Sequence, residues 1–129
     1  MKICTSVTDF VKSREESGKS VGFVPTMGAL HAGHESLVRK SVEENETTVA
    51  SIYVNPTQFD NQNDLAAYPE TLEQDQRIFE SLGVDLLLIP TFEQMYPDGF
   101  RYQVLETEFA RNLCGAHRDG HFTGVLTIV

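Results

Sequence analysis

Two histidines, His31 and His34, stand three residues apart in the segment "FVPTMGALHAGHESLV", which spans residues 23–38. An apolar run that ends in proline precedes the pair, and a stretch with helical spacing follows it. A spacing of three places both rings on one side of the first turn of a helix, where they can act on the same group. The neighbouring Gly28 and Gly33 let a bulky group come close to the backbone. The segment therefore predicts a binding loop between a strand and a helix.

The histidine pair has three interpretations. Zinc would use both imidazoles, but two ligands are too few, and a cation at the start of a helix opposes the helix dipole. A structural pair, hydrogen-bonded within a turn, would account for one histidine but not for two histidines and two glycines. We favour phosphate binding, because free N–H groups at the start of a helix form an anion site. Imidazoles could then donate to the charge that develops on the phosphates of a nucleotide.

The elements that must position this loop follow from the apolar pattern. Strands are predicted at the short apolar runs of residues 20–25, 47–56 and 84–90. Helices are predicted at residues 8–18, 32–45 and 64–83, the last of them broken near Pro69. Strands that alternate with helices predict a Rossmann-like α/β fold, a parallel sheet with helices on both faces that binds ligands at the carboxyl ends of its strands. The strand at residues 20–25 delivers the histidine loop to that edge.

The pattern is weaker after Pro90. We expect a short helix and a turn over residues 92–100, a short strand over 101–106 and a short helix over 107–115. The final segment, "HFTGVLTIV", is an apolar element without a polar tail. Because the sequence stops within an element, we expect it to be part of a longer protein.

Composition and charge exclude several classes of protein. The 129 residues, 40% hydrophobic and 22% charged, suit one globular domain. The net charge is −9, and residues 41–76 hold eight acids without a lysine or arginine, which argues against nucleic acid as a partner. No apolar run approaches the roughly 18 residues of a membrane span, so we expect a cytoplasmic protein. Cys4 and Cys114 lack CxxC spacing and are interpreted as free thiols.

The motifs carry a resemblance to a known family. "HAGH" resembles the HxGH signature of the nucleotidyltransferase superfamily. The longer series "PTMGALHAGH", "VNPTQF", "YP", "MYPDG" and "GHFTGVLTIV" is similar, in the same order, to the pantoate-beta-alanine ligase family. The resemblance implies an ATP-dependent ligation of pantoate and beta-alanine to pantothenate through a pantoyl adenylate, with Mg²⁺ held by the ATP phosphates. It also implies a homodimer.

The resemblance further implies that residues 1–129 are the N-terminal part of a Rossmann-like nucleotide-binding domain. The second half of the family fold, with a lysine-aspartate-glutamine cluster and a serine-rich loop, and the C-terminal domain are absent from this sequence. We therefore expect the isolated 129-residue chain to be inactive, because the loss of even one well-placed phosphate donor typically costs ~10²–10³ in rate.

The same resemblance implies roles for individual residues. The ATP-binding segment covers Met27, Gly28, Ala29, Leu30, His31, Ala32, Gly33 and His34, with His34 and His31 as the catalytic pair. Gln58 would grip pantoate and later beta-alanine, since an amide both donates and accepts. The remaining pantoate-pocket and beta-alanine-pocket residues are Pro25, Thr26, Met27, Val125, Ile128 and Val129, and three further candidates are Asn55, Arg118 and His121. Plain core packing remains an alternative for Met27 and for the three residues near the end, whose spacing fits one helix face. Arg118 and His121 could equally be ordinary loop residues.

Two departures and two alternatives remain at this stage. Asp119 replaces the proline of the family's "RPGHF", and Glu70 follows "YP" where the family commonly has a basic residue; both changes would weaken substrate affinity without altering the fold. The chain could instead be another HxGH adenylyl- or cytidylyltransferase, in which Gln58 would have no role. It could also be a non-catalytic module for nucleotide binding or association.

Overall fold

Four parallel strands form one sheet in the part of the chain that the computed structural model describes, residues 1–59, 65–69, 71–112, 118 and 120–129. The strands are β1 (Lys2–Cys4), β2 (Val21–Thr26), β3 (Thr47–Ile52) and β4 (Leu86–Leu88). They pair in the order β1-β4-β3-β2, so β1 and β2 are the two edges. This arrangement confirms the predicted α/β fold with a parallel sheet.

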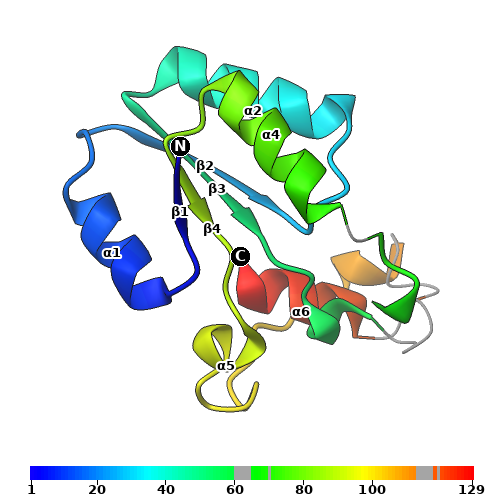
Figure 1. Ribbon diagram of the computed structural model, residues 1–129. Helices are drawn as coiled ribbons and strands as arrows, with labels where there is room; N and C mark the ends of the chain where they lie inside the picture. Colours follow the sequence, from blue (N-terminus) through cyan, green and yellow to red (C-terminus); the bar gives the residue numbers. More distant parts are fainter. Residues whose placement is uncertain (60–64, 70, 113–117, 119) are drawn as a thin grey trace.

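Helices cover both faces of the sheet, as predicted. The helical elements are α1 (Val7–Glu15), α2 (Ala32–Glu44), η1 (Pro56–Gln58), α4 (Leu72–Leu82), α5 (Phe92–Met95), η2 (Phe109–Asn112) and α6 (His121–Ile128). From β1 the chain crosses to the far edge at β2 and then steps back through β3 to β4. Right-handed crossovers therefore place α1 on one face and the neighbouring α2 and α4 on the other (Figure 1).

The core lies between the sheet and the pair of helices α2 and α4. Its buried members are Val24, Val38, Ala50, Ile52, Phe79, Val84 and Leu87. All six residues of β3 are buried because this strand is interior to the sheet and covered on both faces. Val24 and Thr26 of β2 are buried, whereas Phe23 and Pro25 alternate to the opposite face and are exposed there.

Several boundaries differ from the predictions. The strand predicted at residues 101–106 is wrong, since these residues are irregular and exposed. An extended segment becomes a strand only where a sheet edge is available to pair with it. The sequence pattern did not predict β1, whose three residues are too short to show a period. Of the helix predicted at 107–115, residues 109–112 form a 3₁₀ turn, and the rest of that range from 113 onward lies outside the described residues.

The helices of the described residues do not include one that is both long and apolar enough to span a membrane. Three sequence positions discussed above, Glu70, Cys114 and Asp119, lie outside the described residues.

Candidate active site

The histidine pair caps helix α2. His31 is the N-cap residue, and its Nδ1 accepts a hydrogen bond from the Gly33 N–H at 3.1 Å. The backbone N–H of His31 in turn donates to Nδ1 of His34 at 3.4 Å. The two imidazoles thus form a capping box, a motif in which Ser or Thr usually pairs with Glu or Gln. Their ring centroids are 4.0 Å apart. The structural interpretation of the pair is therefore correct as far as the turn is concerned.

The same hydrogen bonds determine which ring nitrogen carries the proton. Because Nδ1 accepts in both rings, the proton of each neutral imidazole is on Nε2. Burial lowers the pKa of His34, the neighbouring His31 lowers it further, and Asp75 partly opposes both. At neutral pH the His34 ring is therefore uncharged, and its Nε2–H remains available as a donor. A structural cap and a phosphate donor are thus compatible roles for one ring.

The N–H groups of residues 28–30, which precede the helix, are occupied. At the helix start, where we expected free N–H groups, the Gly33 N–H is taken by Nδ1 of His31. The Gly28 N–H donates to Thr26 Oγ1 at 3.2 Å. The N–H groups of Ala29 and Leu30 each donate to one carboxylate oxygen of Asp75, both at 2.9 Å. The physical reason is the left-handed turn, with φ of 83° at Gly28 and 50° at Ala29, which directs these groups toward helix α4. The amides of residues 28–30 are therefore not available to an external anion, whereas the imidazoles of His31 and His34 could donate to it.

A cavity of about 320 Å³ adjoins the loop at the carboxyl ends of β2 and β3. The sequence-predicted residues that line it are Pro25, Thr26, Met27, His34, Asn55, Gln58, Val125, Ile128 and Val129. Segments far apart in the sequence therefore share one cavity, which has the size of a small-molecule site, commonly ~300–1,000 Å³. Gly28 lines a neighbouring cavity instead. His31 and Arg118 are exposed and do not belong to the lining described for either cavity.

Helix α6 completes the cavity by packing directly on η1 (Figure 1). The contact requires glycine at position 124, since a Cβ there would lie 2.4 Å from the carbonyl oxygen of Thr57. Nδ1 of His121 lies 2.9 Å from the carbonyl oxygen of Gln58 and fixes the end of η1 to the start of α6. His121 thus positions Gln58 through the backbone.

Asn55 also connects the elements around the cavity. Its Nδ2 donates to the Gly124 carbonyl at 3.3 Å. Its Oδ1 accepts from the Tyr96 hydroxyl at 3.1 Å and from the Thr57 hydroxyl at 3.0 Å. The residue is only 1% exposed. Because these protein groups engage both ends of the amide, Asn55 is better placed to organise the wall than to bind a ligand.

Sequence reasoning missed Asp75 and Tyr53. Asp75 lies on the inward face of α4, one turn before the buried Phe79, and is 2% exposed. An acid at a position that the helical period assigns to the core was the available signal. Tyr53 lines both cavities, and its buried hydroxyl has no hydrogen-bond partner among the described residues. Burial, followed by the nearby Tyr96 and Glu93, raises the pKa of Tyr53 to about 12.

A second cavity of about 430 Å³ adjoins the first. Met27, Tyr53, Tyr68 and Pro90 line both cavities and so form a shared wall between them. Asp75 supplies the charged group of the second cavity, and the Tyr68 hydroxyl lies 3.5 Å from the Gly28 carbonyl oxygen, its acceptor. Both cavities therefore meet the histidine loop at Met27, and the first cavity also reaches His34.

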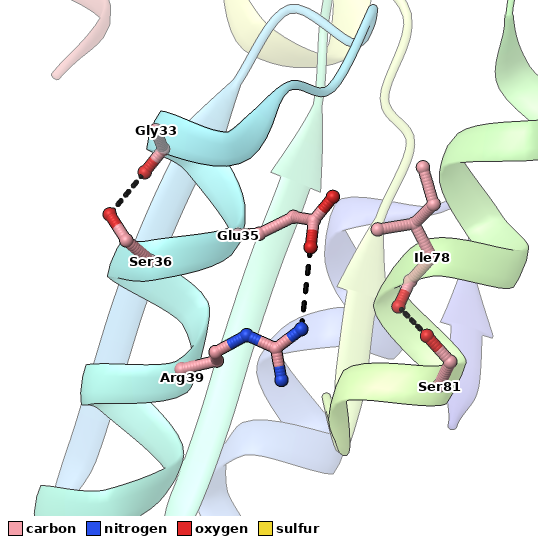
Figure 2. A network of polar contacts seen from close by, with 6 residues as sticks. All are labelled: Gly33, Glu35, Ser36, Arg39, Ile78 and Ser81. Atoms are coloured by element: carbon pink, nitrogen blue, oxygen red, sulfur yellow. Dashed lines mark hydrogen bonds and ion pairs between the residues drawn. The ribbon is translucent and has the colours of Figure 1, made fainter.

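Polar and charged side chains in the first turns of α2 pair with groups of the same helix (Figure 2). Ser36 Oγ donates to the Gly33 carbonyl at 2.7 Å, and Arg39 pairs with Glu35 at 3.4 Å. Figure 2 shows the Glu35 and Arg39 side chains directed from α2 toward α4. The Arg39 guanidinium is thus engaged by Glu35. No group of three His, Cys, Asp or Glu side chains that could hold a metal ion occurs within the described ranges.

A parallel α/β sheet with a ligand-sized cavity and paired histidines at its carboxyl edge defines a Rossmann-like α/β protein. The family model for pantoate-beta-alanine ligase matches residues 1–129, and the chain belongs to that family. It is 47% identical over 128 residues to the pantothenate synthetase of Bdellovibrio bacteriovorus, with 99% of this chain and 51% of the relative covered. It is 49% identical over 132 residues to the pantothenate synthetase of Thermosipho africanus, with 100% of this chain and 48% of the relative covered.

Solved structures agree with the family assignment. A pantoate-beta-alanine ligase from Francisella tularensis superposes with a TM-score of 0.94 at 46% identity, covering 99% of this chain and 50% of that one. A pantothenate synthetase from Thermus thermophilus gives a TM-score of 0.88 at 43% identity, covering 99% of this chain and 46% of that one. The chain thus spans about half the length of the relatives that it matches.

Proposed function

We propose that this chain forms the N-terminal half of a pantoate-beta-alanine ligase site and contributes its histidine loop and pantoate pocket. The observation that carries the proposal is the single cavity lined by Met27, His34, Gln58 and the α6 residue Val125. An amide beside an apolar wall suits pantoate, which combines hydroxyl and carboxylate groups with two geminal methyls. The Francisella tularensis relative is described as complexed with beta-gamma ATP and beta-alanine, which supports the same substrate classes here.

In the proposed reaction the pantoate carboxylate attacks the α-phosphate of ATP, and pyrophosphate leaves. The amine of beta-alanine then attacks the acyl carbon of the pantoyl adenylate, the amide bond forms, and AMP leaves with its bonding electron pair. His34 would donate its Nε2–H to phosphate oxygens on which negative charge develops, with His31 beside it. The role of the remaining lining residues is to hold pantoate in line with that phosphate.

Gln58 would orient pantoate from the opposite side of the cavity. Its backbone carbonyl is held by His121, and its side chain lines the cavity. Met27, Val125 and Ile128 would contact the geminal methyls. We assign no magnesium ligand to the described residues and place the Mg²⁺ that the resemblance implies on the ATP phosphates.

Pantoate binding to the purified chain, followed by calorimetry or by NMR shift changes, tests the assignment of the pocket. Gln58→Ala should abolish the response, because the amide is the main polar group facing the apolar wall. The control is Gln74→Ala, which removes an exposed glutamine of α4. A wild-type response that persists in Gln58→Ala would contradict the proposed role. If a different nucleotidyltransferase substrate binds and pantoate does not, the other HxGH class is favoured.

We further propose that residues 1–129 alone do not turn over substrate. The relatives are about twice as long, and the described pocket wall offers one imidazole, that of His34, but no lysine or arginine for the ATP phosphates. Production of AMP from ATP, pantoate and beta-alanine measures this directly. Robust turnover by the isolated chain would overturn it. The homodimer and the cytoplasmic location remain predictions, the first of which is checked by sedimentation.

A further inference from the structure

We propose that Asp75 is a positioning residue, an internal anion whose carboxylate fills the amide cradle formed by the N–H groups of Ala29 and Leu30 and thereby holds the histidine pair in place. The inference rests on the proposed function only where it concerns phosphate; the geometry of the clamp is independent of any ligand. It follows that an external phosphate has to be bound on the imidazole side of the loop.

Three donors converge on the carboxylate of Asp75. Oδ1 accepts the Leu30 N–H at 2.9 Å, and Oδ2 accepts the Ala29 N–H at 2.9 Å and the Thr71 hydroxyl at 2.8 Å. The Ala29 N–H also lies 3.1 Å from Thr71 Oγ1. Hydrogen bonds to an ionised acceptor are shorter and stronger than those between neutral groups. One side chain of α4 therefore secures two consecutive peptide units of the loop, 45 and 46 residues earlier in the chain.

The backbone of the loop requires such a partner. Ala29 has a φ of 50°, in the left-handed region that few residues other than glycine adopt, and Gly28 before it has a φ of 83°. Successive N–H groups that converge in this way form an anion-binding concavity, which otherwise serves phosphates. A Cβ at position 28 would lie 2.9 Å from Oδ2 of Asp75, so glycine lets the carboxylate reach the cradle.

The chemistry of Asp75 indicates that the residue orients the loop rather than filling the core. The position faces the core and is 2% exposed, and the ion pairs formed by the described residues do not include Asp75. A buried carboxylate is costly unless hydrogen bonds compensate for its lost hydration, and an apolar side chain there would serve packing better. The charge is useful because it orients loop amides, which hydrophobic contact cannot do. The loop then leads directly into the capping box of His31 and His34.

The occupied cradle also has a consequence for specificity. In many phosphate-binding loops the backbone amides contact the phosphate directly. Here the amides of Ala29 and Leu30 are directed toward α4 and are shielded by a negative charge. A nucleotide would therefore meet the Nε2 atoms of His31 and His34, which the capping hydrogen bonds direct away from the backbone.

Amide hydrogen exchange of the purified chain, resolved by NMR, tests the clamp without any ligand. In Asp75→Asn one carboxylate oxygen becomes an NH₂ group, so one loop amide loses its acceptor. Exchange at Ala29 or Leu30 should then rise on the order of tenfold or more, as expected for a buried donor left unsatisfied. Amides of β3 should be unchanged. The control Glu73→Gln removes a carboxylate that is 90% exposed on the same helix and should leave the loop unchanged.

Thr71 variants keep the test decisive if Asp75→Asn fails to fold. Thr71→Val removes the hydroxyl that donates to Asp75 and should raise exchange at Ala29 by a smaller factor, whereas Thr71→Ser should restore wild-type exchange. Unchanged exchange at Ala29 and Leu30 in Asp75→Asn, or at Ala29 in Thr71→Val if Asp75→Asn does not fold, would overturn the proposal.

Addition of ATP separates this inference from the proposed function. ATP should shift the ring resonances of His31 and His34, with the exchange of Ala29 and Leu30 still protected by Asp75. Direct phosphate contact at the Ala29 and Leu30 amides, seen as altered exchange on titration, would refute the occupied cradle. If no resonance responds to ATP, the proposed function is weakened, while the exchange measurements decide the role of Asp75 by themselves.

Discussion

Replacing Gly124 by alanine should loosen the helix that closes the cavity. The new Cβ would lie 2.4 Å from the Thr57 carbonyl oxygen, 2.6 Å from its carbon and 2.8 Å from the Gln58 nitrogen. All three are backbone atoms of η1, so no side chain can rotate away. Helix α6 has to move by about 1 Å to restore normal contact distances. That shift breaks the hydrogen bond between Asn55 and the Gly124 carbonyl, which is already 3.3 Å long.

The sign of the effect distinguishes packing from helix propensity. Alanine is favoured over glycine within a helix by about 1 kcal/mol, so propensity alone predicts a more stable variant. Overpacking against a fixed neighbour costs about 1–3 kcal/mol. We expect the clash to dominate, with a net loss near 2 kcal/mol when the lost Asn55 bond, about 1 kcal/mol, is included. For a domain of this size the melting temperature should fall by roughly 5–12 °C.

Thermal and urea unfolding followed by circular dichroism measures the loss. Leu126→Ala, at a residue of the same helix that is 38% exposed, is the control and should change stability less. NMR shifts of Thr57 and Gln58 should move in Gly124→Ala, because their backbone receives the new methyl group. A variant as stable as the wild type, with unchanged shifts in η1, would refute the packing argument for α6.

Two further predictions concern titratable groups. Tyr53→Phe should leave the free energy of unfolding in urea unchanged or raise it by up to about 1 kcal/mol, because it removes a buried hydroxyl that lacks a partner among the described residues. A free energy of unfolding lower than the wild-type value by more than about 1 kcal/mol would show that the hydroxyl has a hydrogen-bond partner. With its pKa raised to about 12, Tyr53 should also show no phenolate absorbance at pH 10. The pKa of His34 is lower in the folded than in the unfolded chain. The unfolded state therefore binds more protons at acidic pH, and the free energy of unfolding should decline as the pH falls below about 6.5. His34→Gln keeps a capping acceptor and should show a weaker decline over that window in pH-dependent unfolding; an equally steep decline would assign it to other groups.

The regular part of the fold could be predicted wherever apolar periodicity is strong. The apolar runs that became β2 and β3 were recognisable, and Val125 and Ile128 share helix α6 as their spacing indicated. Val129, predicted on the same helix face, lies just beyond the end of α6 and is exposed. β1 was not recognisable, because its three residues become a strand only by pairing with β4. Residues 101–106 have the apolar character of a strand but pair with no strand in the described part of the chain. Pairing is a property of the assembled sheet and leaves little trace in a short segment.

Much of the candidate site could likewise be predicted from residue types. Met27, His34, Gln58 and Val125 were selected through the family motifs, and the structure brings them to one cavity. The function of Asn55 and His121 was less accessible, since both act through hydrogen bonds to backbone groups of other elements. Whether the selected residues bind the proposed substrates remains a prediction.

The sequence by itself determined which chemical groups the histidine loop carries and that a strand and a helix flank it. It determined this because side-chain chemistry and helical or strand periods are local properties of the chain. Only the tertiary structure decided where the loop amides point, because that depends on Asp75, which lies 45 and 46 residues beyond its two amide partners. The amides of Ala29 and Leu30 are taken by an internal anion, the carboxylate of Asp75, and the His31 and His34 rings stand at the helix start that follows.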